Sequence, residues 1–303
     1  MRLILSTILG SFLILSPFAG SRVSGQEQPT RLDNRMTKEE VAAKFSAEER
    51  ASVISSRESF LLENATNNFA SATWMRDVYR IVDETEASNA AFFLPNESGK
   101  EFVNLFSLLL NLLNLGEIDA YRFDSDAITI EEKGTVTLPE IFDLNNIPFT
   151  LRLDNTLSFS RLDLPASDVK SYYIKEKWIF DQRTGKGDVI PVAICPVLHH
   201  QESYDFFDVG VLKTPLFWVH VEDIAPYLHK AITPGALSTL SKLGNNVSLF
   251  DVLRSRLYEG DIYQIGIRNL MKYANSPEEL KQQQLLAEAE LQQYLEKFRN
   301  LKK

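Results

Sequence analysis

The middle of the chain carries long runs of aromatic and β-branched residues, and these runs restrict the fold more than any other sequence feature. Residues 169–181 are rich in Tyr, Ile, Trp and Phe, and residues 189–198 form a second run of this kind. Such residues favour strands because their side chains pack well on a pleated surface. A glycine-containing stretch at 183–188 separates the two runs and predicts a hairpin loop. We therefore expect a mainly antiparallel central sheet, with residues 216–221 as a further strand.

Shorter strands are predicted on the N-terminal side of this block. Residues 118–123 and 128–132 have the composition of short strands. Residues 150–153 and 157–159 read as two more, because an Asp-Asn pair typical of a turn lies between them.

Helical spacing is found on both sides of the predicted strands. The strongest pattern is a leucine-rich stripe over residues 102–113, and Gly116 stands where a glycine commonly ends a helix. A second helix is expected over residues 71–83, because its apolar residues recur at helical spacing. Residues 248–257 predict a further helix with one apolar face.

The last predicted helix begins at the sequence Ser-Pro-Glu-Glu, residues 276–279. Serine caps the helix, proline suits its first turn, and glutamate reaches back to the cap. The helix is expected to run to about Leu301, with an apolar stripe at Ala287, Leu291, Tyr294, Phe298 and Leu301. A stripe of about two heptads favours a helix packed on its own domain over a coiled coil. A helix that binds a partner remains the alternative.

The N-terminus has the pattern of a secretory signal peptide. Arg2 precedes the apolar stretch 3–15, and small residues at the −3 and −1 positions predict cleavage before Gln26, with cleavage after Ser21 as the alternative. The stretch is shorter than the ~20 residues that a membrane span needs. No cysteine follows it, so the pattern is not that of a bacterial lipoprotein. Cleavage before Gln26 leaves 30 basic and 41 acidic residues, a mature net charge of −11.

We therefore expect an exported α+β protein with a helical N-terminal segment, a central mainly antiparallel sheet and C-terminal helices. The expected divisions are a signal peptide over 1–25, a flexible or helical segment over 26–63, an α+β core over 64–275 and a C-terminal helix over 276–303. A capping box at residues 37–40 predicts a short helix in the second of these.

Charge and cysteine content exclude several functional classes. The chain has 41 acidic and 32 basic side chains, and a net charge of −9 argues against a nucleic-acid binder. It argues weakly against docking on anionic lipid as well. The single cysteine cannot form an internal disulfide, a four-cysteine zinc site or an iron–sulfur cluster. No cofactor is expected.

The predicted strands are not followed by a catalytic or nucleotide-binding motif such as G-x-S-x-G, a Walker loop or G-x-G-x-x-G. Cys195 lies in an apolar run and is expected to be a buried, inert thiol. His199 and His200 would point to opposite faces of a strand, so they cannot share one metal ion without a bend. No catalytic, cofactor-binding or metal-binding residue is therefore assigned. Two alternatives stay open: a hydrolase or metal enzyme using Cys195, His199 or His220, and a small-ligand module with an aromatic pocket.

Aromatic residues are concentrated in the segments with the clearest strand or helix patterns. Aromatic side chains and arginines form cores, and they also dominate subunit interfaces. We expect these segments to supply both the core and the subunit interfaces of this protein. The candidate interaction residues are Trp74, Arg76, Tyr79, Arg80, Tyr172, Trp178, Phe180, Phe217 and Trp218.

Several motifs occur in an order that resembles a known family. They are WMRDVYRIVD at 74–83, SDVKSYYIKEKWIFD at 167–181, DVIPVAICP at 188–196, PLFWV at 215–219 and SLFDVLRSR at 248–256. Their sequences and order are similar to those of the gliding-motility protein GldN, also called PorN. The resemblance extends over most of residues 64–300. Ala225 departs from the pattern, because many members of the family carry an arginine near that position.

The resemblance implies a periplasmic subunit of the type IX secretion system of Bacteroidetes. In that family the protein joins the lipoprotein GldK/PorK in a large ring under the outer membrane, together with other secretion-motor subunits. The family is not known as an enzyme family. The resemblance therefore implies a scaffold that is homo-oligomeric within the ring, with no nucleic-acid partner and no membrane span of its own.

Overall fold

The protein was analysed as a computed structural model. It describes residues 74–96, 103–124, 129–160, 164, 166–181, 186–204, 207–231 and 247–300. All of them belong to the second of two units into which the chain divides, Leu32–Lys303. The predicted signal peptide and the helical segment that follows it, including its capping box, lie outside the described residues.

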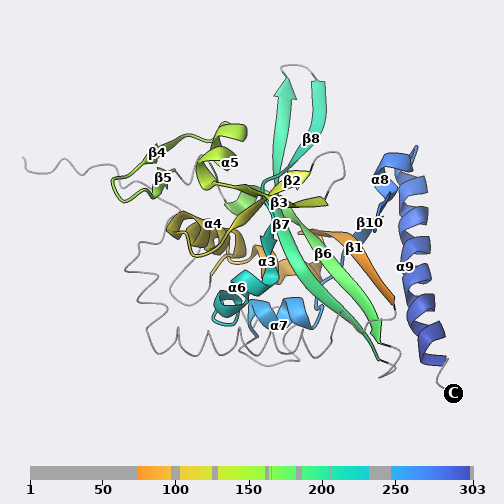
Figure 1. Ribbon diagram of the computed structural model, residues 1–303. Coiled ribbons are helices and arrows are strands. Elements are labelled where there is room, and N and C mark those ends of the chain that lie inside the picture. Colours follow the sequence, from red (N-terminus) through yellow and green to blue (C-terminus); the bar gives the residue numbers. More distant parts are fainter. Residues whose placement is uncertain are drawn as a thin grey trace, which may run out of the picture. The chain divides into compact units, whose positions relative to one another are not determined.

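A seven-stranded sheet in which every pairing is antiparallel is the centre of the described structure (Figure 1). Its order is β11-β10-β1-β6-β7-β8, and β9 pairs with β7 beside β8. The strands are β1 (Trp74–Asp83), β6 (Val169–Asp181), β7 (Lys186–Tyr204), β8 (Phe207–Pro215), β9 (Val219–His220), β10 (Asp261–Ile265) and β11 (Arg268–Asn269). The mainly antiparallel central sheet expected from the sequence is confirmed.

Strand β1 lies between β10 and β6, so the beginning and the end of the described chain meet in the sheet. The helix expected over residues 71–83 is wrong, because Trp74–Asp83 pairs with β6 along its whole length. Val78 is buried against one cluster and Tyr79 against another. A strand buried on both faces lacks the polar alternation that would distinguish it from a helix, so its spacing misleads.

The predicted hairpin between the two aromatic runs is confirmed by the antiparallel pairing of β6 with β7, although its loop lies outside the described residues. The strand expected over residues 216–221 is mostly wrong. Only Val219–His220 is a strand, and a helix begins at Val221. Trp218 forms an isolated bridge with Tyr121 instead, with N–O distances of 2.8 and 2.9 Å.

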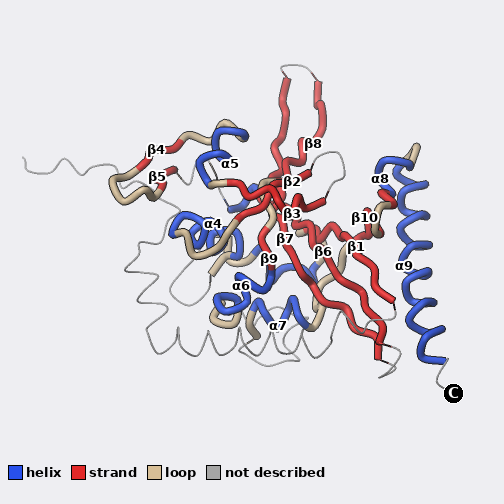
Figure 2. The backbone as a smooth tube through the Cα atoms, in the orientation of Figure 1, coloured by secondary structure: helices blue, strands red, loops and turns tan. Residues whose placement is uncertain are grey.

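Short helices cover one face of the sheet (Figure 2). They are η2 (Ala87–Asn89), α3 (Ala90–Phe93), α4 (Leu105–Leu115), α5 (Leu138–Leu144), η3 (Ala166–Asp168), α6 (Val221–Leu228) and α7 (Leu249–Arg254). The predicted leucine-rich helix is α4, where Asn104 caps the start and Gly116 ends the helix at φ 69°. Helix α7 has the predicted start, with Ser248 and Asp251 in a capping box, but it ends before residue 257.

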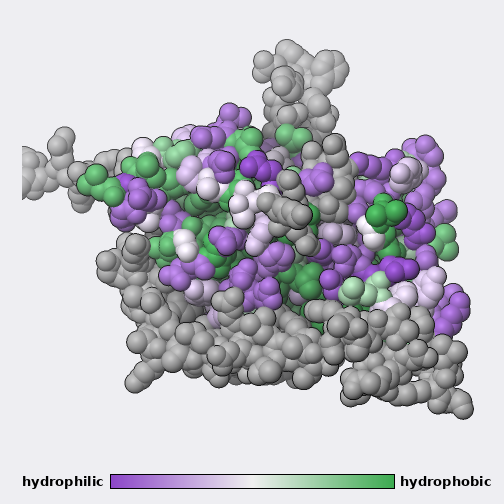
Figure 3. All heavy atoms as spheres, in the orientation of Figure 1, coloured by the Kyte–Doolittle hydropathy of each residue, from purple (hydrophilic) through white to green (hydrophobic). Residues whose placement is uncertain are grey.

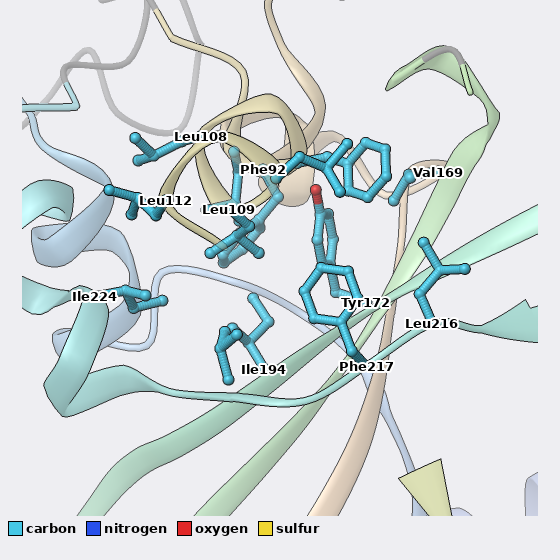
Figure 4. Packing of buried hydrophobic residues seen from close by; sticks show 14 of the residues in the cluster. Phe92, Leu108, Leu109, Leu112, Val169, Tyr172, Ile194, Leu216, Phe217 and Ile224 are labelled. Atoms are coloured by element: carbon cyan, nitrogen blue, oxygen red, sulfur yellow. The ribbon is translucent and has the colours of Figure 1, made fainter. Parts of the chain in front are cut away.

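The main hydrophobic core lies between these helices and the sheet. Figure 4 shows Leu109 of α4 pointing toward Ile194 of the sheet, while Leu112 lies on the side of α4 toward Ile224 of α6. The rings of Phe92 and Tyr172 are 5.9 Å apart. Burying one such side chain contributes about 1.5–3 kcal/mol. The leucine stripe of α4 is therefore what fixes this helix layer on the sheet.

Two small hairpins complete the α+β arrangement, and both confirm predicted strand pairs. Strands β2 (Ala120–Asp124) and β3 (Thr129–Val136) pair with each other and contribute to a second core, in which Tyr79, Tyr173 and Trp218 pack together. Strands β4 (Phe149–Leu151) and β5 (Leu157–Phe159) form the other hairpin. Their Phe149 and Phe159 pack on α5.

Helices α8 (Leu270–Tyr273) and α9 (Pro277–Asn300) lie against β1, β6 and β10. The predicted start of α9 is confirmed, because the hydroxyl of Ser276 accepts a hydrogen bond from the backbone of Glu279 at 3.1 Å. Ala287 and Leu291 are buried in a third cluster with Trp178. The C-terminal helix therefore packs on its own chain, as its apolar stripe of only about two heptads predicted.

The segment between α7 and β10 is pressed against β1. The side-chain amide of Asn89 donates to the carbonyls of Asp83 and Glu259, both at 2.8 Å. A Cβ atom added to Gly260 would lie 2.6 Å from the carbonyl oxygen of Ile81. Glycine is required at this position because the obstacle is backbone, which cannot rotate away.

The replacement Gly260→Ala is expected to destabilise the fold by about 1–3 kcal/mol, because the segment must move off β1. Urea unfolding measures the effect. Ser255→Ala, at an exposed position of the same segment, is the matched control and should change the free energy of unfolding by less than about 0.5 kcal/mol. Equal effects of the two replacements would contradict the close approach of Gly260 to the Ile81 carbonyl.

Candidate interaction site

All nine predicted interaction residues lie within the described residues. Seven are buried, and their exposed fractions range from 0 to 5%: Tyr79, Arg80, Tyr172, Trp178, Phe180, Phe217 and Trp218. These seven contribute to the core. Trp74 and Arg76, at the beginning of β1, have accessible side chains. The role of all nine in partner binding stays a prediction.

Glu176 is the centre of a buried charge network that the sequence did not predict. Its side chain is fully buried in β6. The Nε atom of Arg80 lies 2.9 Å from its Oε2 atom, and the Nε atom of Arg256 lies 3.1 Å from Oε1. Trp178 Nε1 and the Tyr258 hydroxyl donate to the same carboxylate, each at 2.8 Å. Four donor side chains thus satisfy one buried carboxylate.

Arg80 extends this network to the last helix. Its Nη2 atom lies 2.7 Å from Oε2 of Glu288 in α9, and its Nη1 atom donates to the Gly260 carbonyl at 2.8 Å. Arg256 lies over the ring of Trp178, with 5.2 Å from Cζ to the ring centre. Strands β1 and β6, the segment before β10 and helix α9 are therefore joined through one group of charges.

The protonation of Glu176 follows from this arrangement. Burial alone would raise the pKa of its carboxyl, but the guanidinium groups of Arg80 and Arg256 outweigh burial and hold that pKa below the ordinary value. The carboxylate is therefore ionised in the folded protein at neutral pH. A charged residue in the inward-facing part of a predicted aromatic strand was the sequence signal that could have revealed it.

The accessible pair Trp74 and Arg76 belongs to a mixed aromatic and basic surface, which we call the Trp74 surface. Trp74 stacks on Tyr294 of α9, with ring centres 5.5 Å apart. Arg76 lies over the Trp74 ring at 5.7 Å, and Lys297 lies over the Tyr294 ring at the same distance. The first residues of β1 and the later part of α9 thus present two aromatic rings and two cations together.

Cys195, His199 and His220, the residues of the alternative enzyme hypothesis, each pack against or bond to other side chains or the backbone of the fold. Cys195 is buried, and burial raises the pKa of its thiol. Nε2 of His199 lies 2.9 Å from the hydroxyl oxygen of Ser171, which is itself fully buried. His220 precedes α6 and packs on the ring of Tyr121, with ring centres 4.5 Å apart. A reactive thiol needs an exposed, electropositive setting, which the Cys195 site does not provide.

Two further observations concern the described residues alone. Within them, no group of three or more His, Cys, Asp or Glu side chains is placed to hold a metal ion. None of the helices in the same part of the chain is long and apolar enough to cross a membrane.

Comparison with known proteins identifies a class of proteins associated with gliding motility and type IX secretion. The chain matches the family described as gliding motility associated protein GldN over residues 67–301, which is most of its length. The chain therefore belongs to the GldN family, and the resemblance seen in its motifs is confirmed. This family is a component of secretion machinery and is not known for catalysis. A search of curated proteins found no match.

The replacement Glu176→Gln is expected to lower the free energy of unfolding at pH 7 by about 3–5 kcal/mol, because two arginines lose their buried counter-charge. Chemical denaturation measures this. Asp261→Asn, which breaks the exposed pair of Asp261 with Lys281, is the control and should cost less than about 1 kcal/mol.

Acid titration gives a second readout of the same replacement. Because the folded pKa of Glu176 is lowered, its contribution is complete above the unfolded value of 4.5 and is lost as the pH falls through the folded value. The unmodified chain should therefore lose more stability in acid than Glu176→Gln does. If the stability of the two proteins fell in parallel with decreasing pH, the result would contradict an ionised Glu176 in the folded state.

Proposed function

We propose that the chain is a non-enzymatic periplasmic scaffold subunit of the type IX secretion and gliding machinery. It forms a ring complex with an outer-membrane lipoprotein of the GldK/PorK type. The observation that carries the proposal is the GldN family match over residues 67–301. The signal-peptide pattern supports a periplasmic location, and the partner lipoprotein supplies the attachment to the outer membrane.

The described structure is compatible with a scaffold. Its large aromatic and charged groups are engaged in its own cores and in the Glu176 network. Such a body is stiff, because buried networks and packed cores resist deformation. A subunit that repeats around a ring must keep one shape in every copy, and other secretion-motor subunits would dock on that repeated surface.

The Trp74 surface is the part of the predicted interaction set that a partner can reach. Tryptophan and arginine are the residue types whose loss most often weakens a protein interface. Trp74 and Arg76 lie at one end of β1, beside α9, and within the described residues the Arg76 side chain donates a hydrogen bond only to the adjacent Met75 carbonyl. Changing Arg76 should therefore alter binding without disturbing the fold.

Co-production tests the proposed complex. The mature chain and a tagged GldK/PorK-type lipoprotein from the same organism are made in one periplasm, and the lipoprotein is purified through its tag. Recovery of the chain in constant proportion to the lipoprotein is the expected result. Recovery of the lipoprotein alone would contradict the ring complex, whatever the state of the isolated chain.

The replacement Arg76→Glu is expected to lower co-purification by about tenfold or more, because it reverses a charge at the contact. Lys272→Glu makes the same charge change at an exposed position of α8 and is the control. Quantitative mass spectrometry of the purified complex measures both. Equal recovery of the two variants would remove the Trp74 surface from the interface while leaving the complex itself in place.

A further inference from the structure

A cleft of about 790 Å³ lies between α9 and strands β1 and β10. It is separate in composition from the Trp74 surface: none of Trp74, Arg76, Tyr294 and Lys297 lines it. Its walls come from the end of β1 and the turn after it, from the segment leading into β10, and from α8 and α9. A volume of this size is typical of sites that bind a ligand or a short stretch of chain.

One row of polar side chains on α9 faces the cleft. Lys281, Gln284 and Glu288 are spaced by three and four residues, which places them along one side of the helix. Lys281 reaches Asp261 of β10 at 2.8 Å, and Glu288 reaches Arg80 of β1 at 2.7 Å. The outer two members of the row are therefore bound to the sheet.

Gln284, the middle member of the row, differs from its neighbours. Its side chain is only 8% exposed, and it lines the cleft. Within the described residues its side-chain amide has no hydrogen-bond partner, and the amide is not among the fully buried unpaired groups, so it reaches the cleft. Such an amide can pair its N–H and C=O groups with a molecule that enters the cleft. The group that would satisfy both is another amide, which accepts from nitrogen and donates to oxygen.

The surroundings of Gln284 are suited to an extended backbone. Ile81, Met271 and Leu285 supply apolar surface along the cleft, and the last two are 38% and 62% exposed. Figure 3 shows hydrophobic residues scattered among hydrophilic ones on the face of the molecule that it presents. A single amide beside apolar contacts is the combination that recognises a peptide backbone and its side chain.

The end of the cleft near the turn after β1 is acidic. Asp83, Glu86 and Glu259 line it, and Lys213 is the base at that end. Within the described part of the chain, none of these three carboxylates forms an ion pair. Glu86 and Glu259 are exposed. Three carboxylates against one amine favour a basic group on whatever occupies the cleft.

We propose that this cleft binds an extended segment of a different polypeptide. A backbone peptide group of that segment pairs with the Gln284 amide, and an apolar side chain inserts between Met271 and Leu285. A neighbouring Lys or Arg of the segment lies at the acidic end, near Glu86. The inference goes beyond the proposed scaffold role and does not rest on it, because it follows from the cleft alone.

Selection from a displayed library of random short peptides tests the proposal with the full mature chain as target. The recovered peptides are synthesised with a fluorescent label, and their binding is measured by anisotropy. We expect sequences that combine an apolar residue with an adjacent Lys or Arg. The replacement Gln284→Leu should weaken their binding about threefold to tenfold, the effect of one lost hydrogen bond. Gln282→Leu, exposed elsewhere on the same helix, should leave it unchanged.

A second variant keeps the test decisive if Gln284→Leu fails to fold. Glu86→Lys changes an exposed side chain and should weaken binding of the same peptides, more strongly at low salt than at high salt. Failure to recover any peptide, recovery of acidic peptides, or unchanged binding to Glu86→Lys would each overturn the proposal. A consensus that matches this chain's own sequence would overturn it too, because the occupant would then be a second copy.

Discussion

The buried carboxylate of Glu176 is the interaction on which the arrangement of strands and helices depends. A charge without water must be paired, and here four donor side chains from three parts of the chain surround it. Arg80 joins the carboxylate to α9, and Arg256 joins it to the segment before β10. Hydrophobic burial holds these elements together, but burial does not select one register. The directional contacts around Glu176 do so, because only one placement satisfies every donor.

The same network explains why the two ends of the described chain meet. Strand β1 lies between β6 and β10, and α9 covers β1 and β10 from one side. Each ladder is antiparallel, so every neighbour is positioned by backbone hydrogen bonds as well as by its side chains. An ordered fold of this kind suits a component of secretion machinery, the kind of protein to which the GldN family belongs. Among the described residues, the buried side chains form the packed cores and the Glu176 network, and the Trp74 surface and the cleft beside α9 are the two surfaces proposed to bind other chains.

Local patterns predicted the elements whose signal is local. The leucine stripe and terminal glycine of α4, the serine cap of α9 and the aromatic runs of β6 and β7 all lie where they were expected. For the candidate site, the sequence pointed to Trp74, Arg76 and Arg80 but missed Glu176 and Gln284. A glutamate or a glutamine is ordinary in a surface pattern. What distinguishes these two is burial, and the surroundings of Glu176 include Arg80 and Tyr258, which are 96 and 82 positions away in the chain.

The amino-acid sequence by itself determined the family, the mainly antiparallel sheet and the start of the last helix, because motif order, side-chain shape and capping act over short stretches. Tertiary structure alone decided that residues 74–83 form a strand, since pairing with β6 outweighs their helical spacing. It also decided which aromatic residues are buried and which remain accessible. Those outcomes depend on contacts between distant segments, and such contacts exist only after the chain has folded.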